Sequence, residues 1–358
     1  GTTDALLQLL DDITLSLEDL ENKFVQIGCL DFSKAFDRLQ PNIVLDKMRK
    51  HGINTRLLSI IADFLSNRKQ CVRLNGNFSN YLDVAVGAPQ GTKLGPLLWL
   101  FYVNDLKCNG FNVVKYADDT TFYKAFSDRH SSVAPAISHT QSWAEANHMI
   151  LNADKTVIMN VSFNYKTVFD ENVVLSDDTQ LKPSDNLKFL GITVDERLSF
   201  SKHVDNLISS CNSRLYLLRQ LKVIGMNSEG LKQFYVANIR SILSYASPAW
   251  FCMLSQTDKD RLERIQRSAT RTIFPNNEYQ DRLSLLHLPT LCDFIFSLGE
   301  RHFSRIVNDP DHPLFSRLIF NTGRISSRNN TIFRPAVCRT QKRAKSFFPL
   351  YMSCANKK

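Results

Sequence analysis

The chain has 358 residues, long enough for one large domain or two ordinary domains with a substantial core. Its 43% apolar and 22% charged residues are typical of a globular protein rather than a disordered one. No apolar run reaches the roughly 18–20 residues of a membrane span, so we expect no membrane partner. The eight cysteines form no CxxC pair, which argues against a zinc knuckle or a disulfide scaffold and favours reduced thiols in an intracellular compartment.

The net charge of +9 is concentrated near the end of the sequence. Residues 301–358 contain twelve Lys and Arg against two Asp, whereas the first 300 residues are close to neutral. A basic segment on a neutral body predicts a polyanionic partner. A solvated surface tail is the alternative interpretation.

Residues before about 198 mix predicted helices with predicted strands. Apolar periodicity predicts helices at 3–20, 41–51, 54–65, 97–106 and 134–147. Strands are predicted at 23–32, 70–76, 80–86, 157–161, 173–175 and 187–194, with a turn at Asn75–Gly76 and a hairpin at 115–123. From residue 200 the pattern is helical, at 202–223, 228–246 and 258–273.

The stretch KYADDTTFY (115–123) places two adjacent carboxylates, Asp118 and Asp119, between two apolar runs. Neighbouring carboxylates repel each other unless a cation lies between them. Hard oxygen ligands favour Mg²⁺ or Mn²⁺, and a pair of such ions supports phosphoryl transfer. A third ligand is then expected from another strand end, and Asp31 lies at the end of the predicted strand 23–32. The alternative is an Asp-Asp turn and a helix-capping Asp.

Five motifs occur in the order and approximate spacing of the palm motifs of reverse transcriptases. They are LDFSKAFD (30–37), GAPQGTKLGPLLW (87–99), YADD (116–119), LNADKT (151–156) and FLGITVD (189–195). The linking text FLSNRKQCVRLNG (64–76) and the later SYASPAW (244–250) match as well. The chain therefore resembles the reverse transcriptase of non-LTR (LINE-type) retrotransposons, especially the jockey-like branch.

The resemblance implies a role for individual residues. Two metal ions, Mg²⁺ or Mn²⁺, would be held by Asp31, Asp118 and Asp119, with help from the backbone carbonyl of Phe32. Lys155 would protonate the leaving pyrophosphate.

Further roles concern the nucleotide and the primer. Phe36 would exclude a ribose 2′-OH, Gln90 and Gly91 would border the incoming nucleotide, and the hairpin of Phe189, Leu190 and Gly191 would support the primer 3′ end. The alternative for Phe36 and for the hairpin is core packing, and for Gln90 and Gly91 it is a loop-to-helix turn. The alternative for Lys155 is a solvated surface charge.

The predicted helix 258–273 carries a basic stripe that is recognised from residue spacing alone, without reference to the family resemblance. Arginines recur at spacings of three, three and four residues, opposite an apolar side. They are Arg261, Arg264, Arg267 and Arg271. Such a stripe suits the phosphates of a primer–template duplex, and a solvated helix face is the alternative.

The resemblance implies an α+β fold. A right-hand polymerase palm (an antiparallel sheet with helices) at 1–198 would precede a helical thumb at 199–285 and a basic C-terminal region at 286–358. The implied activity is RNA-directed DNA polymerisation, with an RNA template, a DNA primer and a dNTP as partners, in an intracellular and nuclear location. A non-catalytic nucleic-acid-binding remnant is the alternative. The fingers region and endonuclease of the family are expected to be missing, and with them much of the activity.

Overall fold

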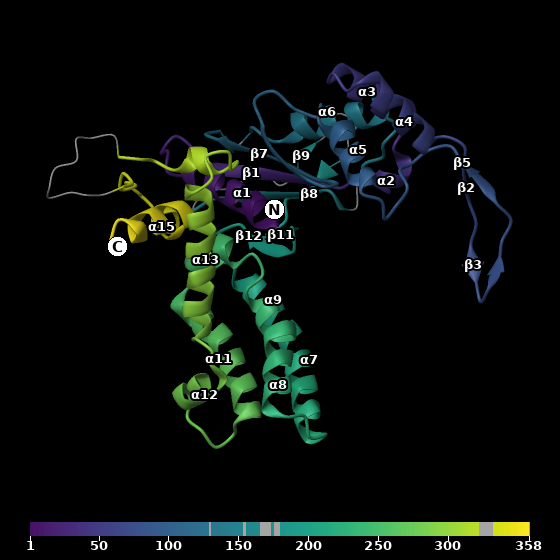
Figure 1. Cartoon of the computed structure of the whole chain (residues 1–358). Coiled ribbons are helices and arrows are strands. Elements are labelled where there is room, and N and C mark those ends of the chain that lie inside the picture. Colours follow the sequence, from purple (N-terminus) through teal and green to yellow (C-terminus); the bar gives the residue numbers. More distant parts are fainter. Residues whose placement is uncertain (129, 153–154, 165–172, 175–179, 322–331, 358) are drawn as a thin grey trace. The chain divides into compact units, whose positions relative to one another are not determined.

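The computed structural model describes residues 1–128, 130–152, 155–164, 173–174, 180–321 and 332–357 (Figure 1). It divides into two compact units. The first contains 1–25, 161–167 and 185–358, and the second contains 26–160 and 168–184. The bounds of these two units differ from the ranges predicted for the palm, the thumb and the C-terminal region, and that division into three remains a prediction.

The second unit is built on a four-stranded sheet in the order β6–β7–β1–β8. Its strands are β1 (Phe24–Leu30), β6 (Asn112–Tyr116), β7 (Asp119–Phe126) and β8 (Val157–Val161). β1 reads as a nearly continuous apolar run because six of its seven residues are buried. Its one amide side chain, Gln26, is satisfied by Asn160 and by the backbone NH of Val133.

Helices of the same unit pack aromatic side chains against the segment that follows β1. α5 (Leu94–Val103) supplies Trp99, and α6 (Ala134–Ala146) supplies Trp143. Both rings lie about 6 Å from that of Phe32, at 6.0 and 5.8 Å between centroids. The ring of Phe32 therefore packs against both tryptophan rings. A further strand pair of this unit is β9 (Val173–Val174) with β10 (Gln180–Leu181).

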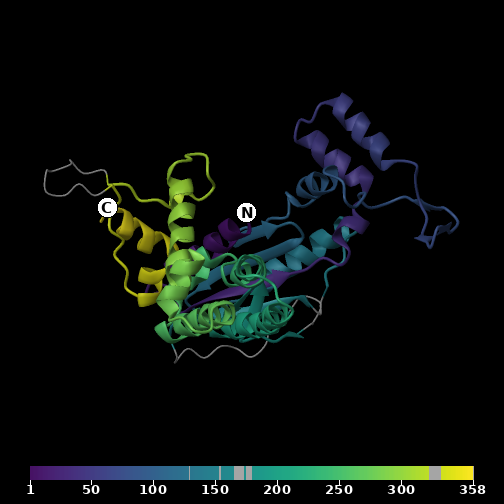
Figure 2. The same ribbon diagram turned by 60° about the horizontal axis from the view of Figure 1, so that its bottom comes forward.

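In the sequence, a helix pair and a two-stranded ribbon follow α2 (Ala35–Arg38) and precede α5. The helices are α3 (Pro41–Lys50) and α4 (Thr55–Leu65). In the ribbon, β2 (Arg68–Gln70) pairs with β5 (Leu82–Val84), and β3 (Arg73–Leu74) pairs with β4 (Asn77–Phe78). Both views show it projecting away from α4 (Figures 1 and 2). The predicted turn is confirmed, since Asn75 and Gly76 both have positive φ.

The first unit is mostly helical. It contains α1 (Thr2–Ser16), the hairpin β11 (Asn186–Phe189) with β12 (Ile192–Asp195), α7 (Ser201–Val223), α8 (Ser228–Tyr235), α9 (Ser241–Leu243), α10 (Ser247–Trp250), α11 (Gln256–Ile273), α12 (Tyr279–Leu286), α13 (Leu291–Val307), α14 (Gln341–Lys345) and α15 (Phe347–Ala355). Helices α7, α8 and α11 pack together (Figure 1), and helices of this bundle appear nearly end-on in Figure 2.

Two predictions for this unit need correction. The helix predicted at 228–246 is interrupted by a π-helical segment, Val236–Arg240, between α8 and α9. The strand predicted at 187–194 is a two-stranded hairpin, because Leu190 and Gly191 form a turn in its middle.

Candidate active site

Asp31 is fixed by backbone pairing that continues beyond β1. Phe32 forms an antiparallel bridge with Leu151, and the NH of Asn152 donates to the carbonyl of Asp31 at 2.9 Å. The segment leading into β8 therefore lies alongside the segment leaving β1. The helix-capping interpretation of Asp31 is wrong, since the residue that precedes α2 is Lys34.

Asp118 and Asp119 lie at the tip of the β6–β7 hairpin. Tyr116 pairs with Asp119, so Ala117 and Asp118 form the turn, and Ala117 takes the left-handed conformation with φ 52°. Such a conformation is costly for alanine. The turn is stabilised by the indole NH of Trp99, which donates to the Ala117 carbonyl at 2.6 Å. The predicted hairpin is confirmed, and its tip is pinned to α5.

One pocket of the second unit, of about 430 Å³, collects residues from four of the motifs. It is lined by Asp31, Phe32, Ser33, Lys34, Ala35, Phe36, Asp37, Gln90, Asp118, Asn152 and Lys155. These positions come from chain segments up to 124 residues apart. The structure thus brings most of the predicted catalytic and nucleotide-binding residues into one cavity.

The electrostatics of the pocket are those of crowded carboxylates with the ammonium of Lys155 beside them. Burial raises the pKa of Asp119, and the charges of Asp118 and Asp31 raise it further. The ammonium of Lys155 donates to Asp31 Oδ2 at 3.0 Å. This hydrogen bond, with the field of all three carboxylates, raises the pKa of Lys155. Lys155 therefore carries a proton at neutral pH, and the raised pKa makes its ammonium a weaker acid than that of a free lysine.

The three carboxylates suit a divalent cation by their chemistry. They are hard oxygen donors, and the mutual repulsion seen at Asp119 is relieved when positive charge enters. Among the residues that the structure describes, however, no three acidic, His or Cys side chains are already gathered closely enough to hold a metal.

The loop of 87–91 forms the wall beside Phe36. Backbone NH groups of Gly87 and Ala88 donate to the carbonyls of Leu39 and Phe36 at 2.7 and 2.9 Å. Gly87 has φ 84°, and a Cβ there would lie 2.9 Å from the Asp37 carbonyl oxygen. A glycine is therefore required for this close approach.

Side chains of the same wall are ordered by two contacts. The amide of Gln90 donates to Asp37 at 2.8 Å. The half-buried ring of Phe36 packs against Trp99 with 5.7 Å between centroids. Gly91, with φ 79°, is exposed and has open space around it, and it does not line the pocket. Phe36 and Gln90 are thus placed beside the carboxylates, whereas Gly91 supplies only a turn.

Sequence reasoning missed five residues of this pocket: Ser33, Lys34, Ala35, Asp37 and Asn152. All of them lie inside the motifs LDFSKAFD and LNADKT. A signal was available, because Lys34 is a cation within three residues of the candidate metal ligand Asp31. Its left-handed conformation, with φ 52°, was not predictable from the residue type.

The predicted primer-supporting hairpin belongs to the first unit. Phe189 is only 3% exposed, so its ring is a core residue, as the alternative interpretation held. Leu190 and Gly191 form the turn between β11 and β12, with φ 46° and 85°. The Phe189 ring is therefore buried, whereas Leu190 is half-buried and Gly191 is exposed at the turn.

The arginine stripe on α11 is only partly free. Arg264, Arg267 and Arg271 are exposed, and the guanidinium of Arg267 lies over the ring of Tyr279 at 4.6 Å. Arg261 instead donates to Asp205 and to Asp258 at 2.5 and 3.0 Å. Three of the four predicted phosphate contacts are exposed, and the fourth has a structural partner.

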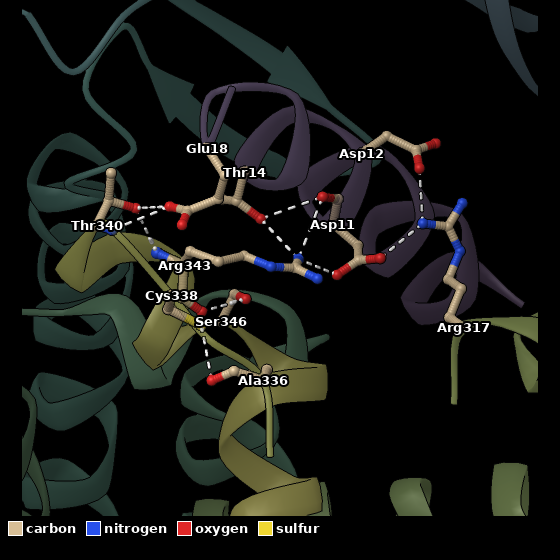
Figure 3. Close-up of polar contacts among 10 residues, drawn as sticks. All are labelled: Asp11, Asp12, Thr14, Glu18, Arg317, Ala336, Cys338, Thr340, Arg343 and Ser346. Carbon is tan, nitrogen blue, oxygen red and sulfur yellow. Dashed lines mark hydrogen bonds and ion pairs between the residues drawn. The ribbon is translucent and has the colours of Figure 1, made fainter. Parts of the chain in front are cut away.

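The basic C-terminal segment uses several of its charges inside the fold (Figure 3). Arg317 donates to Asp11 and Asp12 of α1 at 2.7 and 2.6 Å. Arg343 is buried, and it pairs with Asp11 and bonds Thr14. Glu18 accepts hydrogen bonds from Thr340.

Two more cations of the segment are held by backbone carbonyls, Arg339 by those of Leu17 and Glu18, and Lys342 by that of Leu198. Arg324, Arg328 and Lys358 lie outside the described residues. The interpretation of residues 301–358 as a solvated or wholly nucleic-acid-facing tail therefore needs correction. Much of its charge packs this segment onto α1.

Comparison with known proteins agrees with the motif order. The family model described as reverse transcriptase (RNA-dependent DNA polymerase) matches residues 9–194, just over half of the chain. The chain belongs to the reverse transcriptase family. The fold is accordingly that of a polymerase palm and thumb, α+β as predicted.

Individual relatives are RNA-directed DNA polymerases of non-LTR retrotransposons. The chain is 31% identical over 208 residues to the RNA-directed DNA polymerase from mobile element jockey of Drosophila melanogaster, covering 54% of this chain and 22% of that protein. It is 25% identical over 326 residues to the probable RNA-directed DNA polymerase from transposon BS of the same species, covering 85% and 34%. The chain thus spans about a fifth to a third of these relatives.

Among solved structures, apo telomerase from Candida tropicalis is similar at 12% identity and a TM-score of 0.41, covering 80% of this chain and 48% of that one. This score is too low to establish a shared fold. Within the described residues, no helix combines the length and apolar character needed to cross a membrane.

Proposed function

We propose that this reverse transcriptase chain contains the catalytic centre for RNA-directed DNA synthesis. The observation that carries the proposal is the single pocket in which Asp31, Asp118 and Lys155 meet Phe36 and Gln90. The substrates would be an RNA template, a DNA primer and a deoxynucleoside triphosphate. The primer 3′-OH would attack the α-phosphate, and pyrophosphate would leave.

Asp31, Asp118 and Asp119 would hold two divalent cations, Mg²⁺ or Mn²⁺. Such ions neutralise charge on the attacking and leaving oxygens during phosphoryl transfer. Lys155 would give a proton to the leaving pyrophosphate from the position that it holds beside Asp31. Phe36, braced by Trp99, would occupy the space of a ribose 2′-OH.

Gln90 would border the base, because its amide is held by Asp37 at the rim of the same pocket. The exposed arginines of α11 would contact phosphates of the primer–template duplex. An intracellular, nuclear location remains part of this proposal.

Primer extension on an RNA template tests the proposal directly. Asp118→Asn keeps the shape of the turn and removes one negative ligand. We expect it to abolish extension, a loss of at least about 10²–10³-fold on the scale of removing one electrostatic stabiliser. Template binding should stay nearly unchanged, because Asp118 is no phosphate contact. The control is Asp83→Asn, which removes an exposed carboxylate from the ribbon. Equal extension by wild type and Asp118→Asn would contradict the catalytic assignment and favour a non-catalytic nucleic-acid-binding protein.

A further inference from the structure

The segment SYASPAW (244–250) lies against the hairpin turn of the first unit. The hydroxyl of Tyr245 donates to the carbonyl oxygen of Leu190 at 3.1 Å. Its ring lies under the next residue, because a Cβ on Gly191 would be 3.2 Å from Tyr245 Cε1. One side chain therefore contacts both residues of the turn.

The turn needs such a contact. A two-residue hairpin loop with positive φ at both positions favours Asn-Gly or Gly-Gly. This loop has Gly191 at its second position, but its first position is Leu190, with φ 46°. A branched apolar residue pays a steric penalty in the left-handed region, and such strain persists only where the surroundings hold it. The Tyr245 hydroxyl holds the carbonyl of the strained residue.

Tyr245 is itself fixed by a closed chain of contacts. The indole NH of Trp250 donates to the Tyr245 carbonyl at 3.1 Å. The fully buried ring of Trp250 meets the ring of His203 edge-on at 4.8 Å. His203 Nδ1 accepts from the backbone NH of Thr193 at 3.4 Å, which returns the chain of contacts to the hairpin.

The hairpin has further contacts with α7, and its turn lies beside a groove. Asn206 of α7 donates to the Thr193 hydroxyl at 3.0 Å, so β12 is tied to α7 as well. A groove of about 690 Å³ opens beside the turn, lined by Lys188, Gly191, Thr193, Asn206, Ser241 and Tyr245 among others. Burial lowers the pKa of His203 to about 4, so it stays neutral and keeps its acceptor nitrogen at neutral pH. The turn is thus anchored on two sides at the edge of this groove.

We propose that Tyr245 is a positioning residue for the Leu190–Gly191 turn, acting through its hydroxyl to keep this turn in the one conformation that aligns the primer terminus. The part concerning the primer rests on the proposed function. The anchoring itself does not, and the two are measured separately.

The anchoring is tested by amide hydrogen exchange in the whole chain carrying Tyr245→Phe. This change removes the hydroxyl and keeps the ring. Exchange at residues 189–192 should become roughly five- to tenfold faster, the factor for loss of one net hydrogen bond. Tyr216→Phe is the matched control, because Tyr216 is an exposed tyrosine of α7 that does not line the groove. Unchanged exchange in Tyr245→Phe would overturn the inference.

A rescue separates positioning from general loss of structure. Leu190→Gly removes the steric penalty that the hydroxyl offsets, so adding it to Tyr245→Phe should restore slow exchange to within about twofold of wild type. Leu190→Ala removes the same side chain beyond Cβ but keeps the penalty, and it should give no rescue. Equal rescue by both, or by neither, would contradict the role assigned to the hydroxyl.

The primer part is tested by extension kinetics of Tyr245→Phe. kcat/KM for the primer–template should fall by about the same five- to tenfold, with the KM for dNTP unchanged. Faster exchange with unaltered extension would reject the role in primer alignment while leaving the anchoring intact. Absence of extension in the wild type as well would count against the proposed function, and the exchange data would still decide the anchoring.

Discussion

The crowding at Asp119 has a consequence that is measurable without activity. Burial and two neighbouring carboxylates raise its pKa, so the folded state binds a proton at Asp119 more readily than the unfolded chain does. This contribution to folding stability is fully present below the ordinary pKa and is lost as the pH rises through the ordinary and then the raised pKa.

We therefore expect Asp119→Asn to raise the Tm slightly at pH 7 in the absence of metal, and to show no gain at pH 3. Millimolar Mg²⁺ or Mn²⁺ should raise the Tm of the wild type and have a smaller effect on the variant. Thermal unfolding with and without EDTA measures both. A metal-induced shift that is identical in the two proteins would remove Asp119 from the metal site.

Phe36 allows a second prediction at the same scale. Its ring is half-buried, is braced by Trp99 and lines the pocket. Phe36→Val leaves space where the ring edge lies, so discrimination against ribonucleotides should weaken by at least about tenfold, the value of a lost steric or apolar contact of about 1–3 kcal/mol. The ratio of kcat/KM for dNTP and rNTP measures it. Phe64→Val, at an exposed position of α4, is the control. Loss of stability without any change in that ratio would show Phe36 to be only a core residue.

At the scale of elements, the arginines of α11 look equivalent in the sequence but differ in exposure and in their ion pairs. Arg264, Arg267 and Arg271 are exposed, whereas Arg261 is held by Asp205 and by the largely buried Asp258. If the three exposed residues each contact one phosphate, replacing them together with Ala should reduce the log–log salt slope of duplex DNA binding by about 2.7.

Arg261→Ala should behave differently. It should leave the salt slope unchanged and lower the Tm, because it leaves Asp258 without its cation. Binding titrations between 50 and 200 mM salt, with unfolding curves beside them, distinguish the two classes. A triple variant with the wild-type slope would assign the stripe to a solvated helix face.

The elements most accessible to sequence reasoning were those with strong local signals. Periodicity located α1, α3, α4, α6, α7 and α11 within a few residues, and Asn75–Gly76 located the ribbon turn. The motif order located the pocket. Periodicity missed the interruption after Tyr235 and predicted a single strand at 187–194, where only the family resemblance implied a hairpin. Leucine at the tip of a turn gives no local signal of its left-handed conformation.

The C-terminal segment shows the opposite limitation. Residues 286–358 were interpreted by their charge alone, yet they contain α13, α14 and α15 and a buried aromatic cluster that includes Phe303, Phe347 and Tyr351. Charge counting does not distinguish a cation that faces solvent from one that pairs with a carboxylate far away in the sequence. Here the acidic partners, Asp11 and Asp12, are more than 300 residues away.

At the scale of the whole chain, these pairs join its two ends within one compact unit. Asp11 is buried and is shared by Arg317 and Arg343 (Figure 3). Breaking a buried pair by removing one partner is far more costly than losing an exposed charge, because the remaining ion is left in a medium that solvates it poorly. We therefore expect the main contribution of the segment after residue 301 to be to the stability of the fold rather than to binding.

Arg343→Ala tests this structural role. Because Arg317 still pairs with Asp11, we expect the unfolding free energy to fall by about 3 kcal/mol, the low end of the range for a broken buried pair. Lys345→Ala, two residues away on the same short helix and exposed, should change it by no more than about 0.5 kcal/mol. Asp11→Asn combined with Arg343→Met should recover part of the loss, since no unpaired buried charge remains. If instead Arg343→Ala leaves stability intact and lowers the salt slope of nucleic-acid binding by about 0.9, Arg343 faces phosphate, and the interpretation of this segment as a polyanion-binding tail returns.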